Sequence, residues 1–240
     1  MNNQEFSASF DTLLNSYISK GSFGDTQPDI RLDEWEKSVF LTKFQEELVL
    51  SLYNGHNPYG ASFESTEEMR RYLSPLVVEV GLNPESNTSG LVLGINSNSK
   101  FFTLPEDLWF ITYEAVNVNY GAGRACGSNG NLEVVPVKQD EYHKVKNNPF
   151  RGANDRRALR LDLSDGVVEI VSKYPVSKYY VRYLKKVKPI VLVDLKDTEL
   201  SVNGVNEESE CELPEVLHRR ILEGAVQMAL RSKGIVAQSQ

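Results

Sequence analysis

The residues whose types and spacing come closest to chemistry are the glycines of residues 119–131. The run Gly-Ala-Gly-Arg-Ala-Cys-Gly at 121–127 is similar to a phosphate-binding loop, but Cys126 occupies the place of the third glycine that dinucleotide binding requires. The chain contains no Gly-Lys-Ser or Gly-Lys-Thr, which excludes a P-loop. We therefore interpret the segment as the mobile tip of a hairpin that a partner could order, with Tyr120 and Arg124 as interface candidates.

Histidines, cysteines and serines form no catalytic or metal-binding pattern. His56, His143 and His218 occupy different segments without a paired-ligand spacing, and we expect each at the surface or at a helix end. Cys126 and Cys211 lie 85 positions apart, which favours two reduced intracellular thiols. Nucleophile motifs such as Gly-x-Ser-x-Gly do not occur, and adjacent carboxylates on a helix point apart. We expect no cofactor, no metal and no enzymatic activity.

Charge is distributed unevenly along the sequence. The net charge is −7, yet residues 144–188 hold twelve Lys and Arg against four Asp and Glu, a net +8, and the remainder carries −15. The basic segment could contact nucleic acid or an acidic partner, pair with the acidic part of a neighbouring copy, or form a solvated face. Since tight non-specific duplex binding needs a positive surface, we expect DNA to pass near the protein without being gripped.

Within the basic segment, residues 148–157 are the best candidate for an interface. Phe150 and Arg151, together with Arg156 and Arg157, offer an aromatic side chain and several guanidinium groups, which are enriched at interface hot spots. A proline and a glycine in the segment predict a fixed, extended loop. Two alternatives remain: Phe150 covers a sheet edge while the arginines are solvated, or the arginines contact DNA directly.

The composition is that of a soluble globular protein. The 240 residues are 40% hydrophobic and 25% charged, and a chain of this length can bury a real core. The longest apolar runs, such as residues 189–193, are far too short to span a bilayer, so we expect no membrane partner. The N-terminus lacks a basic region followed by an apolar stretch, and we expect no secretory signal.

Helical periodicity predicts three helices near the N-terminus, over residues 5–19, 33–53 and 65–73. The second is the clearest, because Asp33 and Glu36 have capping-box spacing and Asn54-Gly55 supplies a left-handed end. Its buried stripe comprises Leu41, Phe44, Leu48 and Leu52. A fourth helix begins at Pro214, with a stripe formed by Leu217, Ile221, Ala225 and Met228, and with Gly224 and Ala229 permitting close approach.

Alternation and β-branched residues predict strands between the helices. The expected strands are 76–80, 91–93, 101–103, 108–118, 134–137, 158–163, 167–171, 179–184 and 190–193. The strands around 119–131 could pair as a long hairpin, Ser164-Asp-Gly166 turns a second hairpin, and 139–146 forms a helical turn or two.

This order of elements indicates the α+β class: an N-terminal bundle of about three helices, a central antiparallel β-sheet or sandwich, and a C-terminal packing helix. We divide the chain into a helical region (1–75), a β-rich region (76–212) and a C-terminal helix (213–240) that packs on the N-terminal helices. Together they are expected to form one composite domain.

Several sequence segments, in this order, resemble those of a bacteriophage virion protein. They are Phe10–Tyr17, Trp35–Val49, Asn148–Arg151, Tyr180–Lys185 with Pro189–Leu192, and Leu213–Ile221. The set resembles the head-to-tail connector (adaptor or ring) proteins of crAss-like phages that infect Bacteroidales. The resemblance spans about residues 6–230, and it is supported by the order and spacing of these segments.

The resemblance implies a structural protein of the virion tail or neck, assembled in the host bacterial cytoplasm. Its copies would form a homo-oligomeric ring, twelvefold, that contacts the portal protein and other connector rings. Such a ring continues the channel for genomic double-stranded DNA without binding it specifically, and docks tail components. The alternatives are another tail or capsid-associated subunit and a DNA-binding accessory protein.

Ring contacts join two different faces of each copy, so the outer face of the 33–53 helix becomes of interest. We expect its polar residues to be solvated and to be candidates for meeting a neighbouring copy. They are Glu36, Lys37, Lys43, Glu46 and Glu47.

Overall fold

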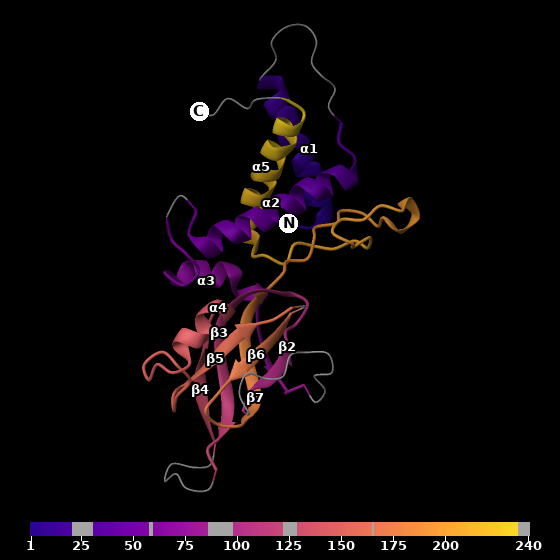
Figure 1. Ribbon diagram of the computed structural model, residues 1–240. Coiled ribbons are helices and arrows are strands. Elements are labelled where there is room, and N and C mark those ends of the chain that lie inside the picture. The colour runs from indigo at the N-terminus through magenta and orange to yellow at the C-terminus, as the bar shows by residue number, and fades with distance from the viewer. Residues whose placement is uncertain (21–30, 58–59, 86–97, 122–128, 165, 235–240) are drawn as a thin grey trace. The chain divides into compact units, whose positions relative to one another are not determined.

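The computed structural model describes residues 1–20, 31–57, 60–85, 98–121, 129–164 and 166–234 and divides the chain into two compact units (Figure 1). The helical unit combines residues 1–76 with 187–240, and the β unit comprises 77–186. The expected boundary at residue 212 differs from this division, because residues 187–212 belong with the helices.

The helical unit contains the helices that the sequence predicts. They are α1 (Asn3–Lys20), α2 (Glu34–Asn54), α3 (Glu67–Leu73) and α5 (Glu215–Ser232), with short 3₁₀ turns η1 (Ser74–Leu76) and η2 (Lys196–Thr198). The capping box of α2 is confirmed, since the Glu36 amide donates to Asp33 Oδ1 at 2.7 Å and the Glu36 carboxylate accepts from the Asp33 amide. Gly55 ends the helix at φ 77°, a left-handed conformation that suits glycine.

Close packing between α2 and α5 depends on Gly224. A Cβ atom at this position would lie 2.0 Å from Phe44 Cζ, so the ring of Phe44 rests on the glycine backbone. Figure 1 shows α5 lying beside α1 and α2. Leu48 and Ile221, which belong to the predicted apolar stripes of α2 and α5, are buried. The close approach expected from the small residues of α5 is therefore confirmed.

An extended segment, residues 188–192, lies along α2 and is held by a row of buried polar side chains. Thr42 Oγ1 accepts from the Ile190 amide at 3.0 Å and donates to the Ile190 carbonyl at 3.3 Å. Ser38 accepts from the Leu192 amide at 3.0 Å, and Gln45 donates to the Lys188 carbonyl at 2.8 Å. Residues 38, 42 and 45 share one face of the helix, so they satisfy backbone groups that water cannot reach.

The strand expected at residues 190–193 is wrong. Val191 makes only an isolated bridge with Ser209. The apolar run is buried as a strand would be, but its backbone hydrogen bonds go to side chains of α2 instead of to a sheet. Sequence pattern alone does not distinguish these two ways of burying an extended segment.

Lys37 was expected on the solvated face of α2, and this is also wrong. Its side chain is 3% exposed, and Nζ lies 2.7 Å from Asp11 Oδ2 and 2.9 Å from Glu34 Oε1. Burial alone would lower the pKa of Lys37, but the two carboxylates raise it above its ordinary value. Because α1 covers this side of α2, the ion pairs tie the two helices together.

The β unit is a curled seven-stranded sheet (Figure 1). Its strands are β1 (Val77–Leu82), β2 (Lys100–Thr103), β3 (Leu108–Asn119), β4 (Asn129–Pro136), β5 (Arg157–Asp162), β6 (Val167–Val171) and β7 (Val176–Lys185). Their order is β1-β7-β3-β4-β5-β6-β2. The expected strand 91–93 lies outside the described residues, and both predicted hairpins, β3–β4 and β5–β6, are confirmed.

The sheet is mixed, which corrects the antiparallel expectation. β4 and β5 run parallel, with Val134 opposite Ala158. Helix α4 (Gln139–Val145) lies between these strands in the sequence and supplies the crossover that a parallel pair needs. Tyr142 and Val145 of α4 pack on Leu159, so this helix covers one face of β5 while the main core buries the other.

Candidate functional site

The most distinctive surface feature of the β unit is an ordered loop that displays a phenylalanine. We call residues 146–156, between α4 and β5, the Phe150 loop. The side chain of Phe150 is 84% exposed, although burying such a ring is worth about 1.5–3 kcal/mol. One exposed apolar residue alone is common on protein surfaces, so the case for a contact surface depends on the order of the loop and on the arginines beside Phe150.

Hydrogen bonds hold the Phe150 loop as a series of turns, where the sequence suggested an extended path. Asn148 Oδ1 accepts from the amides of Phe150 (2.9 Å) and Arg151 (3.2 Å). The Gly152 amide donates to the Asn148 carbonyl at 2.7 Å. A Cβ atom at Gly152 would lie 2.8–3.0 Å from three backbone oxygens, so the turn closes only around glycine. A loop that is already ordered loses little entropy on binding.

Two further side chains brace the Phe150 loop from outside. Arg157 Nη1 donates to the Phe150 carbonyl at 2.7 Å, so this predicted interface residue acts as a support for its neighbour. Asp155 Oδ1 accepts from Lys173 Nζ and from the Tyr174 hydroxyl, both at 2.8 Å. The one acidic group of the loop is therefore used to anchor it to the β6–β7 turn.

Arg151 and Arg156 remain available for a partner. Both are exposed, and neither makes an ion pair with any residue that the structure describes. Lys144 at the end of α4 and Lys146 at the start of the loop are also exposed, which makes the surroundings of Phe150 positive. The site thus combines one apolar anchor with guanidinium groups that a carboxylate could engage in two-point contacts.

Of the other two predicted interface residues, the structure describes Tyr120, which follows β3. Tyr120 is half-buried, and its ring meets that of Tyr174 edge-on at 4.8 Å between centroids. It also covers Gly130, where a Cβ atom would lie 2.5 Å from the ring. Tyr120 is thus part of the hairpin's own packing. Arg124 lies outside the described residues.

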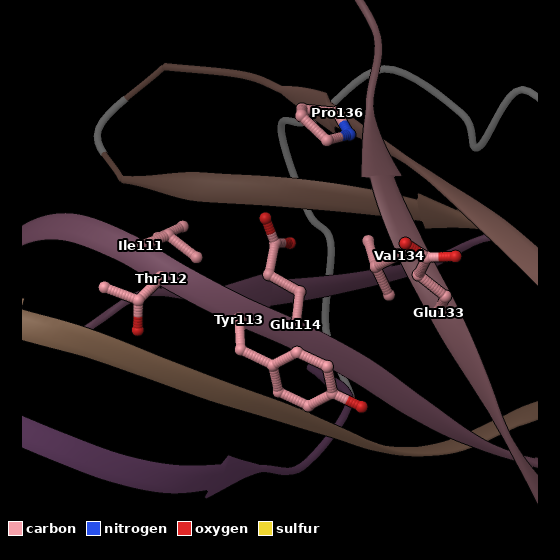
Figure 2. A pocket seen from close by; sticks show the side chains of 7 residues that line it. All are labelled: Ile111, Thr112, Tyr113, Glu114, Glu133, Val134 and Pro136. Carbon is pink, nitrogen blue, oxygen red and sulfur yellow. The ribbon is translucent and has the colours of Figure 1, made fainter. Parts of the chain in front are cut away.

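A second feature is a hollow of about 260 Å³ where β3 and β4 separate. The two strands pair only from Ala115 opposite Glu133 onward, and β4 then turns to pair with β5. The hollow is lined by Ile111, Thr112, Tyr113, Glu114, Glu133, Val134 and Pro136 (Figure 2). Figure 2 shows Glu114 and Tyr113 pointing to opposite sides of β3, as alternation along a strand requires.

Glu114 is a buried carboxylate held by a network. Its Oε1 pairs with Arg160 Nη1 of β5, and its Oε2 accepts from the Tyr179 hydroxyl of β7 at 2.5 Å. Burial raises the pKa of Glu114, and the bonds from Tyr179 and Arg160 offset part of the increase. Burial, with the nearby carboxylate, also raises the pKa of Tyr179. Both oxygens are engaged, so this network braces the divergent strands and offers no free base or nucleophile.

Sequence reasoning did not identify this network, although a signal exists. Glu114 interrupts the mostly apolar run of residues 108–118. An acidic residue within such a run is a candidate for burial, and a buried carboxylate needs a partner. Arg160 occupies a polar position of the alternating 158–163 strand. Pairing β4 with β5 brings Arg160 to the opening between β3 and β4, which no local pattern reveals.

The described ranges contain no group of three His, Cys, Asp or Glu residues that could hold a metal ion. His56 and His143 are exposed, as expected. His218 lies in the first turn of α5 but is buried, with Nε2 2.8 Å from the Leu213 carbonyl oxygen and its ring 5.2 Å from that of Phe6. Across the same ranges, no helix is long and apolar enough to cross a bilayer.

Comparisons with known proteins agree with one another. The model of the family described as phage tail ring protein 3/4 matches residues 1–240. The chain is 50% identical over 234 residues to "Ring protein 3" of Bacteroides phage crAss001, covering 97% of this chain and 96% of that protein. It is 31% identical over 237 residues to "Ring protein 4/5" of the same phage, covering 95% and 92%.

Proposed function

This chain belongs to the phage tail ring protein 3/4 family, and from that premise we propose that its copies form a closed, twelvefold ring in the head-to-tail connector. The ring lies in the tail or neck of the virion and assembles in the host bacterial cytoplasm. It extends the channel through which DNA leaves and binds the rings or tail components next to it, with the portal protein as a further neighbour. The function is structural and non-enzymatic.

The observation that carries this proposal is the Phe150 loop. Phe150 is 84% exposed on a loop whose backbone is fixed by Asn148 and Arg157. Hot spots of protein interfaces combine an aromatic anchor with arginine, which this loop does with Arg151 and Arg156. The family membership supplies the partner class, since a ring subunit needs such a surface for its neighbours.

The charge distribution supports a ring with heterologous contacts. In a ring, one face of each copy binds a different face of the next, so the two faces need to be complementary. A segment of net +8 in a chain of net −7 provides surfaces of opposite sign. The acidic remainder also suits a channel wall that does not hold DNA, because like charges prevent adhesion to phosphates.

The proposal is tested by measuring the mass of the assembled protein. Purified chain, alone and mixed with the portal and the other ring proteins of its phage, should give a discrete high-mass species in mass photometry and closed rings in negative-stain micrographs. Phe150→Ala with Arg151→Ala should lower the fraction of rings, whereas Lys100→Ala, an exposed change on the edge strand β2, should not. A strict monomer in every mixture would contradict the proposal.

The position of the ring needs a separate experiment. Labelling the chain within intact virions and locating the label by cryo-electron microscopy distinguishes a connector ring from another tail or capsid-associated subunit. Density for the label in the neck, around the DNA channel, is the expected result. Label on the capsid surface would favour the alternative.

A further inference from the structure

Residues 193–210 of the helical unit form a hairpin that packs against α2 (the orange to gold loop beside α2 in Figure 1). Its base is closed by a bridge between Ser209 and Val191, which lies just before the hairpin, and its tip by a bridge between Val202 and Val205. The turn between them, Asn203-Gly204, has φ values of 50° and 82°, the left-handed pair that closes a two-residue hairpin. We call this segment the acidic hairpin.

The base and inner side of the acidic hairpin are fixed on α2. Leu195, Val202 and Val205 pack with Trp35 and Val39 of the helix. Trp35 Nε1 donates to the Ser201 carbonyl at 3.2 Å, and Asn203 donates to Glu46 at 2.7 Å. Like the Phe150 loop, the hairpin is therefore ordered before it meets any partner.

Its outer side is negative and partly apolar. Residues 193–210 contain six acidic residues and one lysine. That lysine, Lys196, is already paired with Glu207 at 2.9 Å. Asp197 and Glu199 are exposed and make no ion pair with any described residue. Beside them Leu200 is 40% exposed, so the hairpin presents an apolar side chain between carboxylates.

Glu199 adds an independent observation. It is held at φ 55°, in the left-handed region that glycine or asparagine normally occupies. Glu199 is the residue that ends the 3₁₀ turn η2, a position where the left-handed conformation is common, so the turn fixes its backbone. This residue carries the exposed carboxylate next to Leu200.

We propose that the acidic hairpin of one copy binds the Phe150 loop of the next copy. This contact rests on the proposed ring, and it identifies the two complementary faces that the ring requires. Each surface is an ordered turn that exposes a large apolar side chain beside charged residues: Phe150 beside Arg151 in the loop, and Leu200 beside Glu199 in the hairpin, where Val193 is also exposed. Residues 144–157 hold five Lys and Arg against one Asp, a net +4 that is opposite in sign to the net −5 of the acidic hairpin. Arg151 and Arg156 bind Asp197 and Glu199, and the apolar residues meet between them.

A second copy fits the Phe150 loop better than DNA does. A phosphate backbone would satisfy the arginines but leave the Phe150 ring in water, whereas Leu200 gives it an apolar partner. The complementary surface is also present in every copy at equal concentration. Electrostatic complementarity of this kind fixes which surfaces pair and in what register.

Charge reversal tests the contact. Arg151→Glu with Arg156→Glu, or Asp197→Lys with Glu199→Lys, places like charges at the contact and should raise the concentration needed for half-assembly at least about tenfold. Equal mixtures of the two variants should assemble again, because each variant's altered surface matches the other's. Arg70→Glu with Lys100→Glu is the matched control: both residues are exposed and lie outside the two surfaces.

The outcomes separate this inference from the proposed function. If the wild-type chain forms no rings, alone or with its partners, both the proposed ring function and the hairpin contact are contradicted. If wild-type rings form and both reversed variants assemble as the control does, the hairpin contact alone is overturned. Failure of the mixed variants to recover assembly also overturns it, because complementary reversal should restore the same pair of surfaces.

A cross-link provides a second, direct test. Phe150→Cys with Leu200→Cys, in a chain whose Cys126 and Cys211 are changed to serine, should yield a ladder of covalent multimers when assembled rings react with a short bismaleimide. Denaturing gels and mass spectrometry then identify the linked residues. A link confined to single chains, or no link in assembled rings, contradicts the contact between copies.

Discussion

Glu114 shows how a single buried residue constrains the β unit. Its side chain is 7% exposed and joins three strands, since Arg160 comes from β5 and Tyr179 from β7. Without this carboxylate, the Tyr179 hydroxyl and Arg160 Nη1 lose a buried acceptor, which costs about 1–3 kcal/mol for each unsatisfied group, although Arg160 Nε keeps its pair with Asp162 at 2.9 Å. Glu114→Ala should therefore destabilise the β unit much more than Glu114→Gln, which keeps a hydrogen-bonding group in place.

The pH dependence of Glu114 has a definite sign. Because burial raises its folded-state pKa above the ordinary 4.5, the folded β unit holds this proton more tightly than the unfolded chain does. The resulting stabilisation is fully present below pH 4.5 and is lost as the pH rises through the folded-state pKa. Relative to Glu114→Gln, the wild-type free energy of unfolding should therefore fall over this interval.

Each unit can be followed separately, because the chain has two tryptophans, Trp35 in the helical unit and Trp109 in the β unit. Urea unfolding of Trp35→Phe, monitored by Trp109 fluorescence between pH 4 and 8, measures the Glu114 effect. A wild-type minus Glu114→Gln difference that rises with pH would contradict the predicted sign.

At the scale of elements, the attachment of residues 188–192 to α2 depends on Thr42. Its hydroxyl bonds both the amide and the carbonyl of Ile190, and valine has the same shape without the hydroxyl. Thr42→Val should lower the free energy of unfolding of the helical unit by about 1–3 kcal/mol, because two buried backbone groups lose their partner. Urea unfolding followed by Trp35, in a Trp109→Phe chain, measures the loss.

The matched control is Thr12→Val on α1. Thr12 is exposed and its hydroxyl bonds only the carbonyl four residues earlier in its own helix, so the change should be nearly neutral. Equal losses in the two variants would mean that the Thr42 bonds add nothing beyond helix propensity.

Gly224 decides how closely α5 approaches α2. Alanine is favoured over glycine inside a helix by about 1 kcal/mol, so Gly224→Ala would stabilise an isolated α5. In the folded unit the new methyl group overlaps the Phe44 ring, and we expect a net loss of about 1–3 kcal/mol. Trp35 fluorescence during urea unfolding again provides the measurement.

A second substitution tests that the overlap is the cause. Phe44→Leu removes the ring atoms nearest to Gly224, so the double variant should lose less stability than the two single variants together, with a coupling of about 1 kcal/mol. Strict additivity would show that the clash is relieved elsewhere in the unit.

At the scale of the whole molecule, the charge balance bears on DNA. We predict that the chain binds a short duplex with a Kd no tighter than about 10⁻⁶ M at physiological salt, because its net charge is −7. Fluorescence anisotropy across a salt series checks this. Tighter binding that weakens steeply with salt, and that Arg156→Ala with Arg157→Ala removes, would instead support a DNA-binding accessory protein.

The sequence was sufficient for elements whose signals are local. The capping box of α2, its glycine end, and the hairpin around Ser164-Asp-Gly166 are all specified by residues a few positions apart, and the structure confirms them. The Phe150 loop was also visible, since an aromatic residue among arginines stands out without knowledge of the fold. The order of several sequence segments also indicated a resemblance to crAss-like phage ring proteins, and the family model then matched residues 1–240 of the chain.

Contacts between distant segments were decided only in three dimensions. From the sequence, Ser38, Thr42 and Gln45 resemble an ordinary solvent-exposed polar face of a helix. In the structure, residues 188–192 lie against this face and bury it. Lys37 is buried because α1 brings Asp11 to it, and Glu114 is buried because β5 brings Arg160. Local sequence pattern records which side chains are polar, but the partner that makes a polar group stable when buried comes from elsewhere in the chain. Only the tertiary structure determines that pairing.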